Sequence, residues 1–471
     1  KDPSRTLTFY GLEKNATTIR LAKMNLAVHG LEGNIQKAIS YYDDPHELLG
    51  KADFVMANPP FNVDEVDADK IKNDPRLPFG LPGVNNKGKV SNGNYLWISY
   101  FYSYLNKSGR AGFVMSSQAS SAGRDEATVR RKLVESGHVD AMVAIRSNFF
   151  YTRTVPCELW FFDKGKPAKH RDKVLMLDAR NVYRKVTRKI YDFSPEQLAN
   201  LTSIVWLYRG QSDRYLKLVR QHLLNVTAEA QASIAPLNEF RGAVEKLADK
   251  LKPLVKTAKQ DSVAGAWSAF KGAFDTFDAD ISAFAANAKK QAGHAIAQTA
   301  KNTALHTAAA RLAPLAEASR DLIKDADHLH KLASHVLDAC SAAGLNEQDD
   351  WPGRELQRAR KDADEARNQA VDALKPVRYF HRQAHWLQER FPDAQLRDVP
   401  GLVKLVSRDE IAANDWSLTP GRYVGVAPEE VDEDFDFEAA LKDIHIELQG
   451  LNTEAAELAE RIARNFEELG A

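Results

Sequence analysis

The stretch DFVMANPPFN, residues 53–62, ends an apolar run with an amide, two prolines and an aromatic ring. Proline fixes φ and has no N–H, so two in succession end a strand and leave carbonyl groups without ladder partners. The Asn58 amide and the Pro59 carbonyl then present two acceptors to one donor group, and Phe61 offers a surface for stacking. This combination suits an exocyclic amine on a planar ring, such as that of adenine. Held by two acceptors, the amine nitrogen can leave conjugation and point its lone pair at a methylsulfonium.

An alternation of predicted strands and helices positions this stretch. Apolar runs predict strands at 7–13, 53–57, 110–116, 139–145, 158–163 and 173–178, and periodicity predicts helices at 15–30, 94–109 and about 125–136. Such alternation predicts an α/β fold with a largely parallel sheet and helices on both faces. Ligands of such sheets lie beyond the carboxyl ends of the strands, and Asn58 is at such an end.

From about Val219 the chain is rich in Ala, Leu, Lys and Glu and is predicted to be helical. A heptad seam runs through Trp267, Phe270, Phe274, Phe277, Ile281 and Phe284. Such a stripe is typical of a packing face, here the core of a helical hairpin. A second seam, flanked by acids, runs through Leu441, Ile444, Leu448, Leu451, Ala455, Leu458 and Ile462. We expect it to dock a partner helix or to fold back on its own domain.

The length of 471 residues allows two or three domains, and we divide the chain into residues 1–220, 221–345 and 346–471. A hydrophobic content of 44% with 27% charged residues is typical of a soluble globular protein. No run approaches the roughly 18 apolar residues that would span a membrane, and the first residues do not resemble a secretory signal.

Cysteine and histidine usage favours neither a disulfide framework nor a metal site. Cys157 and Cys340 are far apart in sequence, which suits a reducing cytosol, and CxxC motifs are absent. Histidines cluster at 327–335 and 381–385, but the second cluster lacks the glutamate of HExxH and no third ligand is evident. Solvated or core histidines are therefore the favoured interpretation.

The net charge is zero, but the charges are unevenly distributed. Residues 107–214 contain 20 Lys and Arg against 11 Asp and Glu, whereas residues 429–471 contain 3 against 14. Both segments are compatible with solvated surface. The basic segment also suits phosphates, with a binding contribution that weakens as salt rises.

Four segments, in this order, resemble the amino-methyltransferase family, and specifically the modification (M) subunit of type I restriction-modification systems. They are FYGLEKN, ADFVMANPPFN, GNYLWISYFYSYLNKSGRAGFVMS and IRSNFFYTRTVPCELWFF. The resemblance extends through RYLKLV, and resumes in WSLTPGRYVGV and the terminal helix. Within the latter, residues 416–424 are interpreted as a turn with a short strand. The segment from about 225 to 345 has no recognisable counterpart. The resemblance implies a Rossmann-like class I methyltransferase sheet, followed by a mainly α-helical, partly coiled-coil region.

For the cofactor, the resemblance implies S-adenosylmethionine. Glu13 matches the acidic residue that binds the ribose hydroxyls, although a charge at a helix N-terminus is the alternative interpretation. Asp43 or Asp44 matches the acid that meets the cofactor's adenine, and the choice between them stays open.

For the target base, the resemblance implies that Asn58 and the Pro59 carbonyl hold the N6 amine of adenine. Pro60 completes the motif, and Phe61 stacks on the ring. Phe150 is expected to close the other face.

Two further residues, Phe149 and Tyr151, are alternatives to Phe150, and ordinary sheet packing is possible for all three. The base must leave the duplex to be reached, so base flipping belongs to the same hypothesis. Pro156-Cys157 raises the alternative of a cytosine C5 methyltransferase, but that class expects Pro-Cys-Gln and here Glu158 follows. We therefore disfavour it.

One departure from the family concerns the Gly-rich turn that cradles the methionine part of the cofactor. It should lie about 20 residues before the ribose acid, yet twelve residues precede Glu13. The sequence is therefore expected to begin inside the fold, without its first strand and a preceding helical domain. We expect weak or absent S-adenosylmethionine binding by this chain alone.

The leading hypothesis is a cytoplasmic adenine-N6 DNA methyltransferase subunit, which obtains its sequence specificity from a separate specificity (S) subunit. A restriction (R) subunit is expected in the full complex, and the acidic terminal helix is expected to dock onto the S subunit. A protein-glutamine methyltransferase, whose substrate amide could use the same pocket, and an inactive scaffold are the alternatives.

Overall fold

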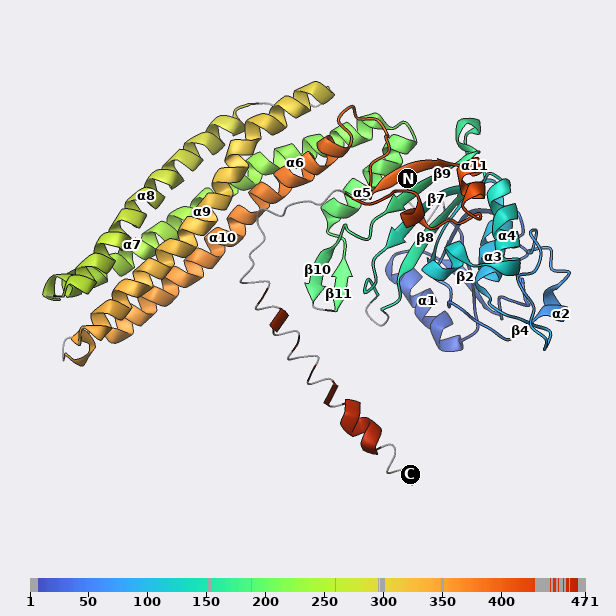
Figure 1. The fold of residues 1–471 in the computed structure, drawn as a ribbon, viewed down its shortest axis with the longest axis horizontal. Coiled ribbons are helices and arrows are strands. Elements are labelled where there is room, and N and C mark those ends of the chain that lie inside the picture. Colours follow the sequence, from blue (N-terminus) through green and yellow to red (C-terminus); the bar gives the residue numbers. More distant parts are fainter. Residues whose placement is uncertain are drawn as a thin grey trace. The chain divides into compact units, whose positions relative to one another are not determined.

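The structure is a computed structural model. It describes residues 7–150, 154–187, 189–258, 260–294, 296, 301–348 and 351–427, and then 441, 444–445, 448, 452, 455–456 and 458–464. The chain forms two compact units. Unit 1 contains residues 1–194 and 397–471, and unit 2 contains residues 195–396 (Figure 1). Unit 2 is therefore inserted between two segments of unit 1.

Unit 1 is built on a six-stranded sheet with the order β12-β9-β7-β8-β6-β3. The strands are β3 (Ala52–Ala57), β6 (Leu105–Ser116), β7 (Val139–Ile145), β8 (Cys157–Asp163), β9 (Lys173–Asp178) and β12 (Val403–Ser407). Strands β3, β6, β7 and β9 run in one direction, whereas β8 and β12 run in the other.

The α/β class is confirmed, but the sheet is mixed where we expected a largely parallel one. The described residues of the connection between β7 and β8 form no helix. Without a crossover helix, a strand returns antiparallel to its predecessor, and β8 does so between β6 and β7.

Three small two-stranded sheets complete the strands of unit 1. Their strands are β1 (Phe9–Glu13) with β2 (Gly33–Lys37), β4 (Val66–Asp67) with β5 (Lys89–Val90), and β10 (Arg184–Thr187) with β11 (Ile190–Asp192). The β1 and β2 strands are parallel and are joined by α1 (Ala16–Val28). The Asn15 side chain caps this helix by accepting from the backbone N–H of Thr17 at 2.8 Å.

Further helices in the described part of unit 1 include α2 (Ala68–Ile71), α3 (Asn94–Tyr104), α4 (Arg124–Glu135) and α11 (Arg408–Ala413), with short 3-10 turns η2 (Ser117–Ser121), η3 (Ala168–His170) and η5 (Pro420–Arg422). The predicted helix 94–109 is wrong at its end, because Leu105 already pairs with Ala52 in the sheet. Gly109 allows the close approach of the two strands, since a Cβ there would lie 2.6 Å from the Ala52 carbonyl oxygen.

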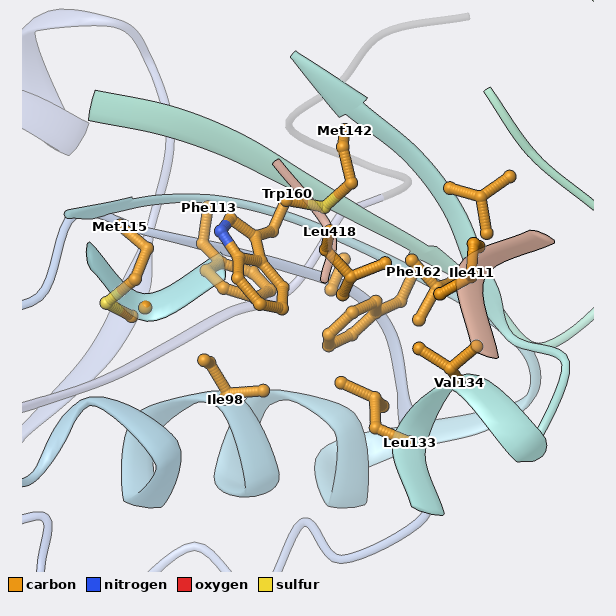
Figure 2. Close-up of a cluster of buried hydrophobic side chains, with 14 of the residues drawn as sticks. Ile98, Phe113, Met115, Leu133, Val134, Met142, Trp160, Phe162, Ile411 and Leu418 are labelled. Atoms are coloured by element: carbon orange, nitrogen blue, oxygen red, sulfur yellow. The ribbon is translucent and has the colours of Figure 1, made fainter. Parts of the chain in front are cut away.

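The main core of unit 1 lies between the sheet and helices α3 and α4 (Figure 2). Phe113, Trp160 and Phe162 from the sheet are buried together with Ile98 and Leu133 from the helices, among others.

The segment after β12 also contributes to this core, through Ile411 and Leu418 (Figure 2). The predicted short strand within 416–424 is wrong. Instead, residues 417–423 form a turn in which the Tyr423 hydroxyl donates to the Ser417 carbonyl at 2.6 Å. Because Leu418 must be buried, the segment packs its side chains onto the sheet instead of extending the sheet.

Unit 2 is helical. It contains α5 (Pro195–Tyr208), α6 (Ser212–Ala232), α7 (Ile234–Thr257), α8 (Asp261–Ala292), α9 (Asn302–Ala342), η4 (Leu345–Glu347) and α10 (Gly353–Arg390). The heptad seam on α8 is confirmed as a packing face against α9, with Phe270, Phe277, Ile281 and Phe284 buried. Within the described residues, no helix combines the length and apolar character needed to cross a bilayer.

Candidate active site

The carboxyl ends of β3, β6, β7 and β9 lie at one edge of the main sheet, because these strands are parallel. Asn58 follows β3 and the segment 146–150 follows β7 at this edge. Three strand spacings separate β3 from β7, which is roughly 14 Å at about 4.8 Å each. The two segments that were predicted to hold a target base thus face the same side, at a separation that side chains and loops can span.

In the Asn-Pro-Pro-Phe turn, the Asn58 side chain is exposed whereas Pro59 is buried. Phe61 is half-buried and packs against the main core. Burial of Pro59 and Phe61 therefore fixes the turn while the amide at its start stays open to solvent.

Asn62 continues the turn in a left-handed conformation, with φ of 54°, which Asn tolerates better than most residues. Its backbone N–H donates to Oδ1 of Asn94 at 2.8 Å, and Nδ2 of Asn94 donates back to Oδ1 of Asn62 at 2.9 Å. The Gly93 N–H donates to the Val63 carbonyl at 2.6 Å. These bonds tie the turn to the first residue of α3. This anchor was not predicted from the sequence, although the run Ser-Asn-Gly-Asn before an apolar helix was its signal.

Glu13 and the segment 38–44 lie next to each other, because Glu13 pairs with Lys37 at the end of the parallel β1–β2 pair. One Glu13 oxygen, Oε1, accepts from the backbone N–H of Asn15 at 2.7 Å. The half-buried carboxylate therefore also supports the start of α1, which was the alternative interpretation of this residue.

The two neighbouring aspartates have different environments. Asp43 is exposed, and its Oδ2 accepts from the backbone N–H of Ile39 at 3.1 Å. Asp44 is half-buried, and its Oδ1 accepts from the Tyr104 hydroxyl at 3.2 Å. Asp43 thus contacts the segment directly after β2, whereas Asp44 contacts the end of α3.

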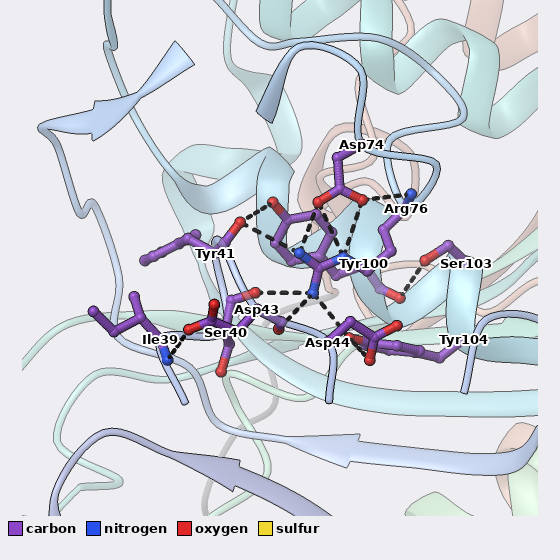
Figure 3. A network of polar contacts seen from close by, with 10 residues as sticks. All are labelled: Ile39, Ser40, Tyr41, Asp43, Asp44, Asp74, Arg76, Tyr100, Ser103 and Tyr104. Atoms are coloured by element: carbon purple, nitrogen blue, oxygen red, sulfur yellow. Dashed lines mark hydrogen bonds and ion pairs between the residues drawn. The ribbon is translucent and has the colours of Figure 1, made fainter. Parts of the chain in front are cut away.

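Arg76 organises this segment and was missed by the sequence analysis (Figure 3). Its buried guanidinium donates to the carbonyl oxygens of Ser40 at 3.0 Å and Asp43 at 3.1 Å. It also binds both carboxylate oxygens of Asp74 and lies 4.4 Å from the ring centroid of Tyr100. Burial opposes the charge of Arg76, but the hydrogen bonds that Arg76 donates, chiefly those to Asp74, outweigh burial and raise its pKa. One residue thus fixes the backbone that carries both candidate acids.

The segment after β7 is braced by aromatic rings. Phe149 packs on Phe193, with ring centroids 4.7 Å apart. Asn148 has a positive φ of 68°, and its carbonyl accepts from the Tyr191 N–H at 3.0 Å. Phe150 is half-buried, and Tyr151 lies outside the described residues. Because Phe149 is engaged with Phe193, Phe150 stays the preferred candidate for stacking on a base.

Cys157 and Glu158 begin β8 at the same edge and are both buried. Burial raises the pKa of the Cys157 thiol to about 11, and the thiol donates to the Val155 carbonyl at 3.4 Å. Burial also raises the pKa of Glu158 to about 8. A thiol that stays protonated at neutral pH is a poor nucleophile, which argues against cytosine C5 chemistry.

One histidine from each predicted cluster lies beside a polar group of the protein. His381 Nε2 donates to the Ala309 carbonyl at 3.0 Å, and burial lowers the pKa of His381. His330 Nε2 lies 3.8 Å from Asp364. Among the described residues, no group of three or more metal-ligating side chains is close enough to hold an ion.

Comparison with known proteins finds similarity over nearly half of the chain. Residues 1–227 match the family described as N-6 DNA Methylase. We call these residues the N-6 DNA methylase region because of this similarity. The N-6 DNA methylase region includes β1 to β11 and ends within α6, so most of unit 2 lies outside it.

Curated relatives of the N-6 DNA methylase region are type I methylase subunits. One is the type I restriction enzyme MjaIX methylase subunit of Methanocaldococcus jannaschii, 37% identical over 211 residues, or 44% of this chain and 37% of that protein. Another is the HindI methylase subunit of Haemophilus influenzae, 29% identical over 44% of this chain and 46% of that protein. The chain thus spans less than half the length of these two relatives.

Among solved structures, the type I restriction-modification methyltransferase subunit from Streptococcus thermophilus matches with 23% identity and a TM-score of 0.39. The match covers 45% of this chain and 43% of that chain.

Proposed function

We propose that this chain contributes the catalytic half-site of an adenine-N6 DNA methyltransferase, as the M subunit of a type I restriction-modification system. The observation that carries the proposal is the Asn58-Pro59 turn. Within an N-6 DNA methylase region, an exposed amide and a rigid proline carbonyl stand at the carboxyl edge of the sheet, where ligands of such sheets bind.

The proposed chemistry needs few groups. The Asn58 side-chain oxygen and the Pro59 carbonyl accept the two N–H bonds of the adenine N6 amine, which holds the nitrogen lone pair out of conjugation. Phe61 and Phe150 stack on opposite faces of the flipped base. S-adenosylmethionine supplies the electrophilic methyl group. As the N–C bond formed, the bond between sulfur and the methyl carbon would break and leave a neutral thioether. The positive charge would pass to N6, where the two oxygen acceptors would stabilise it until the nitrogen lost a proton to solvent.

The residues proposed to bind the cofactor fit its polar groups. We propose that Glu13 binds the ribose hydroxyls of the cofactor and that Asp43 or Asp44 binds its adenine. Glu13 ends β1 and is paired with Lys37 at the end of β2, and Asp43 and Asp44 lie in the segment that follows β2. Of the two Glu13 carboxylate oxygens, Oε1 accepts from the Asn15 N–H. Carboxylates at strand ends are the usual partners of ribose hydroxyls.

We propose that the part of the site that binds the methionine moiety of the cofactor needs a further strand. Among the described strands, β3 pairs with β6 alone, and Phe54 and Met56 on it are 68% and 89% exposed. Exposed apolar side chains on a strand edge are a template for pairing. We place a strand with a Gly-rich turn beside β3. Calorimetry on residues 1–471 should therefore find weak or no S-adenosylmethionine binding, and micromolar binding would contradict this.

The test of the catalytic assignment is Asn58→Ala in the full chain, assembled with its partner subunits. Losing one acceptor should lower methyl transfer from labelled cofactor to DNA by about 10²–10³-fold. Folding should be unaffected because the Asn58 side chain is exposed. Asn34→Ala, at an exposed position of β2, is the matched control. Unchanged transfer by the Asn58 variant would favour a scaffold role, and label in protein rather than DNA would favour glutamine methylation.

The proposed partners are DNA, an S subunit and an R subunit, in the cytoplasm where chromosomal DNA lies. The terminal seam offers a docking face, because Leu441, Ile444, Leu448, Leu458 and Ile462 are 48–55% exposed, while Leu451 lies outside the described residues. Deleting residues 438–471 should abolish co-purification with the S subunit and leave unit 1 folded. Retained assembly would contradict the docking role.

A further inference from the structure

The β10–β11 hairpin is a separate two-stranded element that is not part of the main sheet (Figure 1). All four residues of β10, Arg184–Thr187, are exposed, and so is Lys189 in the turn. A sheet of two short strands buries little apolar surface and is marginally stable by itself. The stability of the hairpin must therefore depend on contacts at its base.

The base of the hairpin is held by the segment after β7. The Arg146 guanidinium contacts two tyrosines at the base of the hairpin, 4.4 Å from the ring centroid of Tyr183 and 4.8 Å from that of Tyr191. The Tyr191 N–H donates to the Asn148 carbonyl, and Phe193 packs on Phe149. The segment that carries Phe150 and the hairpin thus form one connected piece.

Over most of the length of the hairpin, all charged residues are positive. Residues 179–191 contain five Lys and Arg and no Asp or Glu. Asp192, at the end of β11, pairs with Arg184 at 2.7 Å and orders that side chain. Lys185 pairs across the strands with Tyr191 and therefore shares a face with the rings that hold Arg146.

We propose that the β10–β11 hairpin is a DNA-binding arm that contacts duplex phosphates beside the flipped adenine. This inference rests on the proposed function, since it assigns the arm to the substrate of that same site. A cluster of exposed Lys and Arg suits phosphates better than it suits a protein interface core, which is depleted of charged residues. Because the arm is joined to the segment carrying Phe150, phosphate contacts would set the register of the duplex relative to the base pocket.

The experiment measures the binding of a labelled mixed-sequence DNA duplex to the full chain in its subunit assembly, over a series of salt concentrations. The Lys185→Ala/Lys189→Ala variant should bind more weakly at low salt. Each lost phosphate contact should reduce the slope of log affinity against log salt by about 0.9, so two contacts should reduce it by about 1.8.

The matched control is Lys271→Ala/Lys290→Ala, which removes the same charge from exposed positions of α8 in unit 2. Its slope should equal that of the wild type. An unchanged slope in the hairpin variant, or an equal reduction in the control, would overturn the proposal. Loss of a partner subunit with an unchanged slope would assign the arm to a protein contact instead. This experiment measures DNA binding. A failure of the proposed methylation would be detected separately, as the absence of methyl transfer by the wild-type assembly.

Discussion

Asn62 and Asn94 bind each other through two reciprocal hydrogen bonds, of 2.8 and 2.9 Å. One residue lies directly after the Asn-Pro-Pro-Phe turn, and the other is the first residue of α3. The pair connects the candidate catalytic turn to the helix that covers the sheet. The orientation of Asn58 therefore depends on a residue more than thirty positions away, which touches no substrate.

We expect Asn94→Ala to destabilise unit 1 and to impair methyl transfer together. Asn94 is 2% exposed, and its loss leaves the Asn62 N–H without its acceptor. The loss of a partly buried hydrogen bond costs about 0.5–1.5 kcal/mol. Urea denaturation and methyl transfer by the assembled subunit measure the two effects. Equal behaviour of Asn94→Ala and the exposed control Asn34→Ala would show that the pair does not fix the turn.

Arg76→Lys should destabilise the segment 40–44 by about 2–3 kcal/mol. A lysine ammonium cannot reproduce the fork that binds Asp74 while also reaching the carbonyls of Ser40 and Asp43. In the full assembly, the KM for S-adenosylmethionine should rise more than the KM for DNA. Arg131→Lys is the control, since Arg131 pairs with Glu135 on the surface, and its effect should stay within about 0.5 kcal/mol. Equal rises of the two KM values would contradict the link to the cofactor site.

Glu158 should make unfolding dependent on pH. Its pKa is about 8 in the folded chain against 4.5 as the reference, because burial disfavours the carboxylate. Between these values the native state binds more protons than the unfolded state. The free energy of unfolding therefore falls as pH rises, by up to about 1.4 kcal/mol per pH unit from this group.

The Glu158→Gln variant should lose this contribution, so its stability relative to wild type should increase from pH 5 to pH 8. Glu239→Gln, at an exposed position of α7, should show no such trend. Denaturation curves across this pH range measure both variants. A difference between Glu158→Gln and wild type that stays constant with pH would contradict the assignment.

Cys157→Ser should retain methyl transfer within a few-fold. The Cys157 thiol is buried, and its raised pKa of about 11 leaves very little thiolate at pH 8. A thiol reagent at pH 8 should label the folded chain slowly, and should label both cysteines once guanidinium unfolds it. Rapid labelling that abolishes activity would instead support a nucleophilic role.

Much of the main sheet was predictable, since β3, β7, β8 and β9 are continuous apolar runs bounded by polar residues or turns. The directions of these strands were not predictable, because an apolar run has the same pattern in both directions. Strand β2, GNIQK, has too little apolar character to be predicted from its pattern.

Some residues of the candidate site were also predictable from the sequence, and others were not. Asn58 was predictable because prolines leave a local signal, and Glu13 because it ends a strand. Arg76 has only its neighbour Asp74 as a local signal, since its other partners Ser40 and Tyr104 are distant in sequence. Nothing in the residues around Arg76 indicates which carbonyl groups will surround it.

The position of β12 has a consequence for how the chain is synthesised and folded. β12 covers the edge of β9, whose residues after Lys173 are all buried, yet it emerges more than 220 residues later. Contacts this distant in sequence form slowly, and until they form β9 is an open apolar edge. The helices of unit 2 can fold first and bring the two ends of the sheet sequence nearer. A ribosome that stopped after residue 396 would thus release a chain prone to edge-to-edge aggregation.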